Sequence, residues 1–62
     1  MRGAALIYTD AAAELEALAR RLQQELPDSV PCAHLVREIR ASAARARRNA
    51  HDVRCAQARR LF

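Results

Sequence analysis

The sequence is poor in the residues that interrupt helices or cross-link small folds. It contains one glycine, two prolines, two cysteines, one tyrosine, one phenylalanine and no tryptophan in 62 residues. Two cysteines are too few for a disulfide scaffold, so we expect reduced thiols in a cytoplasmic protein. No apolar run approaches the ~20 residues that span a bilayer, and none resembles a signal peptide. These absences favour uninterrupted helices and argue against a membrane protein.

Lysine is absent as well, because all eleven basic residues are arginine. Together with fifteen alanines, this composition is typical of a bacterial genome rich in G and C. The net charge is +4, but residues 10–28 hold five acids against two arginines (−3), residues 29–62 hold eight arginines against two acids (+6), and Arg2 supplies the last charge. An acidic first half therefore precedes a basic second half.

The length of the chain limits the core that it can build. At 62 residues the chain is a single domain, and a domain of this size buries only about 60% of its unfolded surface. Each alanine adds little transfer free energy because it buries little area. We therefore expect the core to be completed by self-association or by another protein.

Turn residues cluster once, in the stretch "PDSVP" at residues 27–31. This cluster predicts a first helix over residues 10–26, a loop over 27–31 and a second helix over 32–60. Thr9 or Asp10 is the expected N-cap of the first helix, and Asp28 or Ser29 that of the second. Residues 1–9 are expected to form either an extension of the first helix or a packed, extended arm.

Apolar residues repeat at helical spacing in both expected helices. In the first, leucines 15, 18, 22 and 26 form a stripe with alanines 11 and 19. The second has a narrow seam with the 3–4 alternation of a coiled coil. The seam consists of Cys32, Val36, Ile39, Ala43, Ala46, Ala50, Val53 and Gln57.

The fold class predicted from these patterns is all-α, a two-helix antiparallel hairpin with a long second helix. Residues 48–60 overhang the first helix, and an isolated helix of that length is marginal in water. A homodimeric four-helix bundle would cover it, with a different protein partner and a monomer as the alternatives. The residues expected to carry the association are Leu15, Leu18, Leu22, Val36, Ile39, Ala43, Ala46, Ala50 and Val53.

Three arginines repeat at intervals of seven along one flank of the seam. Arg40, Arg47 and Arg54 occupy the positions where coiled coils place charges that choose the partner. They are expected either to pair within the hairpin or dimer, or to set the register and recognise an acidic partner. In both cases they would tune the association.

Other arginines face outward on the second helix and suggest a second function class. Arg45, Arg48 and Arg59 could contact the phosphates of a nucleic acid. Glu38 and Asp52 share that face and weaken its field. A small nucleic-acid-binding regulator is therefore the alternative to a protein interaction module.

Catalytic and metal-binding motifs are not apparent. His51 and Cys55 have the i, i+4 spacing of zinc ligands, but two ligands do not make a site. We expect no enzyme activity, metal, cofactor or small-molecule substrate. The function predicted from the sequence is a non-enzymatic regulator, adaptor or accessory subunit that acts through the surface of the second helix.

Overall fold

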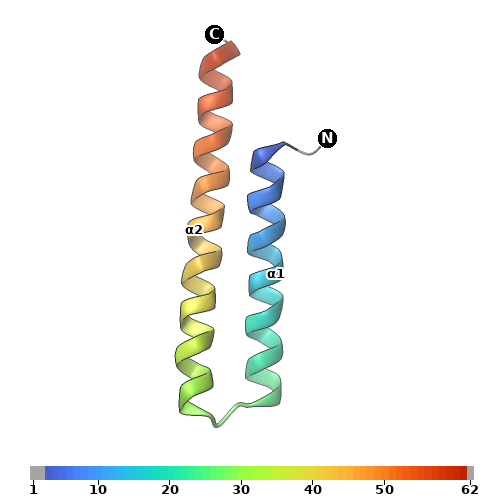
Figure 1. Ribbon diagram of the computed structural model, residues 1–62, viewed down its shortest axis with the longest axis vertical. Helices are drawn as coiled ribbons and strands as arrows, with labels where there is room; N and C mark the ends of the chain where they lie inside the picture. Colours follow the sequence, from blue (N-terminus) through green and yellow to red (C-terminus); the bar gives the residue numbers. More distant parts are fainter. Residues whose placement is uncertain (1–2, 62) are drawn as a thin grey trace.

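Two helices packed side by side make up the fold. The structure is a computed structural model that describes residues 3–61, with side chains up to residue 60. Helix α1 spans Ala4–Glu25 and helix α2 spans Val30–Leu61. They run antiparallel and α2 continues well beyond the start of α1 (Figure 1). The expected all-α hairpin with a long second helix is confirmed.

Helix α1 begins before residue 10, because residues 4–9 extend it, which was one of the two alternatives expected for the N-terminal residues. Its first residue is Ala4, and the N-cap is Gly3, whose backbone is extended (φ −68°, ψ 155°) and whose carbonyl oxygen accepts from the Leu6 N–H at 3.1 Å. The prediction of an N-cap at Thr9 or Asp10 was wrong, because both lie inside the helix. The Thr9 hydroxyl instead donates to the Ala5 carbonyl oxygen at 2.8 Å. The longer helix buries Ala5, which is 7% exposed.

The loop between the helices is closed by backbone hydrogen bonds and a side-chain cap. The Leu26 N–H donates to the Leu22 carbonyl oxygen at 2.9 Å, which ends α1. Ser29 Oγ accepts from the Cys32 N–H at 3.2 Å, so Ser29 is the N-cap of α2, one of the two residues expected there. Helix α2 therefore starts at Val30 rather than at residue 32, with Pro31 in its first turn, where a missing N–H has little cost.

Replacing the cap, Ser29→Ala, should lower the stability of the hairpin. The loss of the side-chain acceptor costs about 1 kcal/mol, which in a domain of this size corresponds to a decrease in Tm of roughly 4–8 °C. Thermal unfolding followed by circular dichroism measures it. Ser42→Ala is the control, because Ser42 lies inside α2 and alanine is the better helix former there. An equal decrease in both variants would contradict the capping role.

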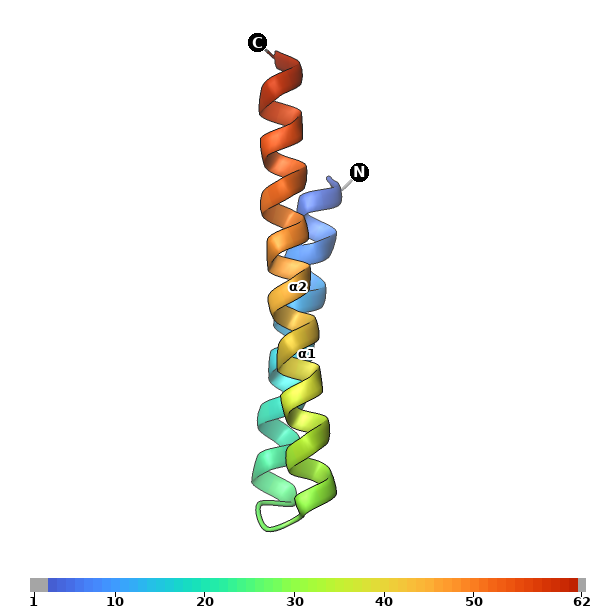
Figure 2. The same cartoon turned by 90° about the vertical axis from the view of Figure 1, so that its left-hand side faces the viewer.

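Small side chains fill the contact between the helices. Nine hydrophobic residues are buried within residues 3–60, and six of them are alanine. The buried residues are Ala5, Ala12, Ala19, Cys32, Val36, Ile39, Ala43, Ala46 and Ala50. The partly buried Leu15 and Leu22 pack against them. The seam expected in α2 is thus buried from Cys32 to Ala50, and the two helices cross at a shallow angle when seen edge-on (Figure 2).

The face that α1 turns to α2 differs from the expected leucine stripe. Alanines at intervals of seven, Ala5, Ala12 and Ala19, lie in the contact. Leu18 and Leu26 of the stripe are 43% and 52% exposed, so they lie outside the contact with α2. Alanine at the centre of the α1 face allows a close approach of the two helices, and the larger Leu15 and Leu22 are accommodated beside it.

Candidate interaction surfaces

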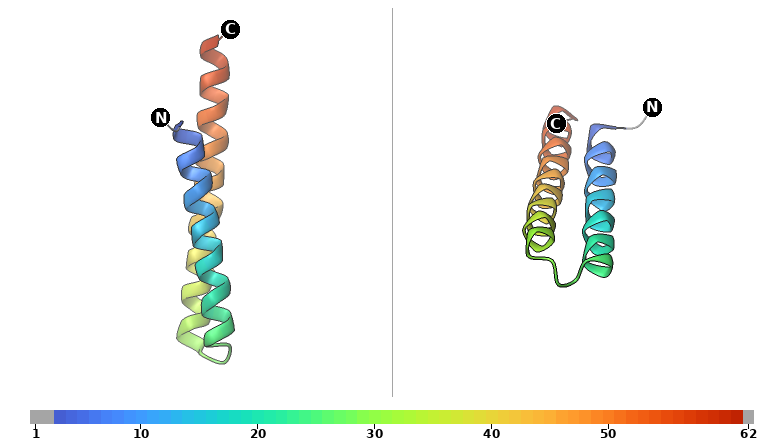
Figure 3. Two further views of the ribbon diagram at one scale, coloured as in Figure 1. Left: turned by 90° about the vertical axis from the view of Figure 1, so that its right-hand side faces the viewer. Right: turned by 60° about the horizontal axis from the view of Figure 1, so that its bottom comes forward.

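The two flanks of the helix contact have opposite character. In an antiparallel helix pair, the residues just outside the seam of one helix face their counterparts on the other, so the hairpin has two sides. One side carries Arg40 and Arg47 of α2. The other side carries residues on the opposite flank of each seam, Leu18 on α1 and Leu35 on α2. Both sides run along the length of the hairpin. Figure 3 shows the ribbon of the hairpin from its α1 edge and from its loop end.

Polar interactions tie the helices together on the first side. Arg47 forms an ion pair with Glu16 of α1, and both side chains are partly exposed (50% and 38%). Arg40 Nη2 donates to Gln23 Oε1 at 2.7 Å. Arg40 and Arg47 therefore pair with residues of the same hairpin, which is one of the two roles expected from their spacing of seven. An exposed pair of this kind contributes about 1 kcal/mol or less to stability.

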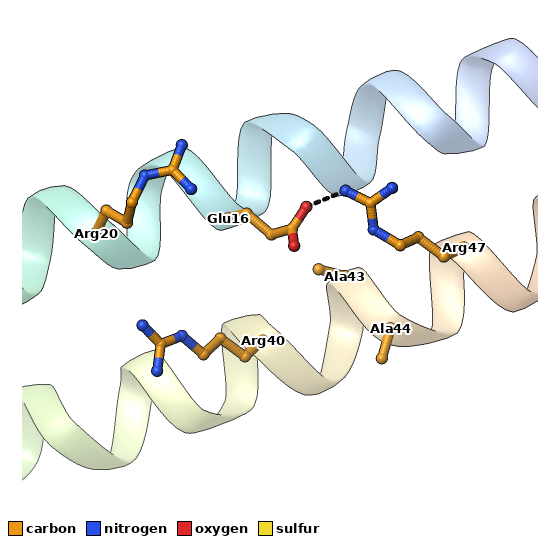
Figure 4. A pocket seen from close by; sticks show the side chains of 6 residues that line it. All are labelled: Glu16, Arg20, Arg40, Ala43, Ala44 and Arg47. Atoms are coloured by element: carbon orange, nitrogen blue, oxygen red, sulfur yellow. Dashed lines mark hydrogen bonds and ion pairs between the residues drawn. The ribbon is translucent and has the colours of Figure 1, made fainter.

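A shallow groove of about 370 Å³ lies between the helices on this side. Ala43 and Ala44 are among its lining residues, and Arg20 of α1 and Arg40 of α2 lie at the end away from Arg47, one on each helix (Figure 4). We call this surface the arginine side. It comprises the exposed residues Arg20, Arg37, Arg40, Arg47 and Arg54.

The opposite side is apolar. Leu18 and Leu35 are 43% and 47% exposed, and the partly buried Leu15 and Leu22 lie between them and the seam. We call these four residues the leucine side. Ile7, three turns before Leu18, is 58% exposed and extends the surface toward the start of α1. Large apolar side chains gathered on one flank mark an interaction surface.

The residues expected to carry association occupy different environments. Five of them, Val36, Ile39, Ala43, Ala46 and Ala50, are buried by α1 within the same chain. Leu15, Leu22 and Val53 are partly buried and Leu18 is exposed. The role of this set in association between molecules stays a prediction. In the closed hairpin, only its leucines and Val53 reach the surface.

The arginines expected to contact phosphates lie among acids and polar partners. Arg45 Nη2 donates to Ser42 Oγ at 2.9 Å. Glu38, Arg45, Asp52 and Arg59 follow one another at intervals of seven, so their charges alternate along one strip of α2. Arg48 and Asp52 line the same hollow. This arrangement gives little net positive field.

The thiols and the histidines do not assemble a metal site. Cys55 Sγ lies 3.5 Å from His51 Nε2, one turn away on the same helix. Cys32 is buried, and its Sγ donates to the Leu22 carbonyl oxygen at 3.6 Å. Within the described part of the chain, no three His, Cys, Asp or Glu side chains gather as metal ligands would. Neither described helix has an apolar stretch long enough to cross a membrane.

Comparisons with known protein families, with curated proteins and with solved structures gave no match for this chain.

Two residues of these surfaces, Leu35 and Arg20, were not among the site residues predicted from the sequence. Leu35 lies seven residues before Ser42 on the flank opposite Arg40, a position that the heptad pattern of α2 already defines. Arg20 could be placed on the arginine side only once the structure showed that Ala12 and Ala19 face α2. The heptad pattern could have identified Leu35, whereas Arg20 required the structure.

Proposed function

We propose that this protein is a non-enzymatic interaction module that associates with a second copy of itself through the leucine side. Two hairpins packed on this side would form a four-helix bundle with the leucines in its interior. The observation that carries the proposal is the exposure of Leu18 and Leu35 on one flank of the hairpin, together with the finding that no large side chain among the described residues is completely buried.

The surface area supports association. A compact monomer of 6.9 kDa exposes about 4,000 Å², whereas this chain exposes 5025 Å². A stable protein interface buries about 800 Å² on each partner, which is comparable to the excess. The radius of gyration of 14.8 Å also exceeds the roughly 10.6 Å of a compact chain of this length. The hairpin has the surface that a second layer of helices would cover.

The charges at the rim of the leucine side suit a second copy. On α1, Glu14 and Arg21 are seven residues apart, and on α2, Glu38 and Arg45 are also seven residues apart. Each rim thus offers an acid and a base at the same spacing, about 10.5 Å along the helix. Opposite charges can meet across an interface between identical chains, and such rim pairs favour one register over others.

Sedimentation equilibrium of the purified chain tests the proposal. We expect a species of twice 6.9 kDa, with a Tm that rises with protein concentration because only the folded state associates. A mass of 6.9 kDa at all concentrations, with full helicity in circular dichroism, would refute self-association. If the chain bound an unrelated protein but did not self-associate, the leucine side would be the binding surface for that protein and the proposed homodimer would be refuted.

A further inference from the structure

We infer that the arginine side binds the phosphodiester backbone of double-stranded nucleic acid, independently of base sequence. This inference does not depend on self-association. The leucine side and the arginine side flank opposite edges of the helix contact, so a bundle formed through the leucines would leave an arginine side open on each copy. It also differs from the phosphate contacts expected at Arg45, Arg48 and Arg59.

Charge is segregated onto this side of the hairpin. Its five arginines are all exposed, and Glu16 is the one acid facing the groove among the described residues. Glu16 is already paired with Arg47. The strip of α2 that contains Arg45 and Arg59 alternates instead with Glu38 and Asp52. The positive field is therefore strongest along the groove, and a local field of one sign attracts a polyanion.

The groove lets a phosphate backbone approach closely. Its lining includes the small side chain of Ala43, above which Glu16 reaches toward Arg47, and the guanidinium groups of Arg20 and Arg40 lie on the two helices beside it (Figure 4). A guanidinium group presents paired N–H donors that match the oxygens of a phosphate. From Arg37 to Arg54 the arginines of α2 extend over about 26 Å. A rigid, straight surface of this length fits a duplex.

The lack of anchoring side chains favours nucleic acid over an acidic protein. Protein interfaces depend on buried aromatic or aliphatic anchors, but the side chains between the α2 arginines on this side are Ala44 and His51, and neither is a large aliphatic anchor. Proteins that bind single strands stack bases on aromatic rings. Tyr8 and Phe62 are the only aromatic residues of the chain, and Tyr8 belongs to the first turns of α1. A surface with charge alone is suited to a duplex backbone.

Fluorescence anisotropy with a labelled 20-base-pair duplex tests the inference. Four to five neutralised phosphates give a slope of log K against log salt of about −3.6 to −4.5 and a loss of roughly 150- to 500-fold between 50 and 200 mM salt. The variant Arg20→Gln/Arg40→Gln removes one guanidinium group from each helix. It should weaken binding roughly tenfold or more and make the slope shallower by about two.

A variant with the same change in net charge serves as the control. Arg45→Gln/Arg59→Gln removes two arginines from the strip of alternating charge, so it should change affinity by less than about threefold and leave the slope nearly unaltered. Equal losses in the two variants would overturn the inference, and so would failure of the unmodified chain to bind the duplex at 50 mM salt. Displacement of the duplex by poly-aspartate at equal charge concentration would assign the groove to acidic proteins instead.

Discussion

Replacing Leu18 by glutamate is expected to convert the proposed dimer into monomers while the hairpin stays folded. Leu18 is 43% exposed in the single chain, so a carboxylate there can reach water. In the proposed bundle the same side chain would be enclosed, and an uncompensated buried charge costs about 3 kcal/mol or more. The dissociation constant should therefore rise at least ~100-fold, which sedimentation equilibrium at several concentrations can measure.

Leu6→Glu is the matched control for this experiment. Leu6 is 51% exposed on the same helix, twelve residues before Leu18. That separation rotates it by about 120° around α1, away from the leucine side. The same charge placed there should leave the dissociation constant within about threefold of its original value. Dissociation by both variants, or by neither, would contradict an interface centred on Leu18.

The seam of α2 could be predicted because its pattern permits only one solution. Seam residues from Cys32 to Ala50 follow one another at intervals of four and three, and apart from Leu35 the positions around them hold only alanine, charged or polar side chains. A face this narrow can be turned toward a partner in one way only. Burial of the seam from Cys32 to Ala50 confirms that prediction. The heptad also places Arg40 and Arg47 on one flank, where they contact α1.

The orientation of α1 could not be read with the same certainty because this helix has more apolar residues than its contact can hold. Leu15, Leu18 and Leu22 form a convincing stripe on their own. The structure instead turns Ala12 and Ala19 fully inward and leaves Leu15 and Leu22 partly buried beside them. Ala12 packs with Ala43 and Ala46 of α2, whereas Ala19 packs with Cys32, Val36 and Ile39. The rotation of α1 about its axis depends on how the side chains of both helices fit together. The pattern of α1 alone does not contain this information. The same rotation of α1 leaves Leu18 exposed on the leucine side and puts Arg20 on the arginine side.

Replacing Ala12 by leucine should test the close approach directly, and it should strongly destabilise the hairpin. Ala12 is 0% exposed and packs with Ala43 and Ala46. A larger side chain would force the helices apart, and overpacking of this kind costs about 1–3 kcal/mol. A domain of 62 residues has a total stability of roughly 3–9 kcal/mol. A loss of about 2 kcal/mol would lower the Tm by roughly 8–16 °C.

Ala13→Leu provides the comparison, because it places the same leucine one residue further along α1, where the side chain is exposed. Leucine is nearly as good a helix former as alanine, so the free energy of unfolding should change by less than about 0.5 kcal/mol. Thermal and urea unfolding should be followed by circular dichroism at one fixed protein concentration, because association shifts the apparent stability. An Ala12→Leu variant as stable as Ala13→Leu would mean that the alanines do not hold the helix axes close together. The rotation of α1, and with it the position of both interaction surfaces, would then have to be revised.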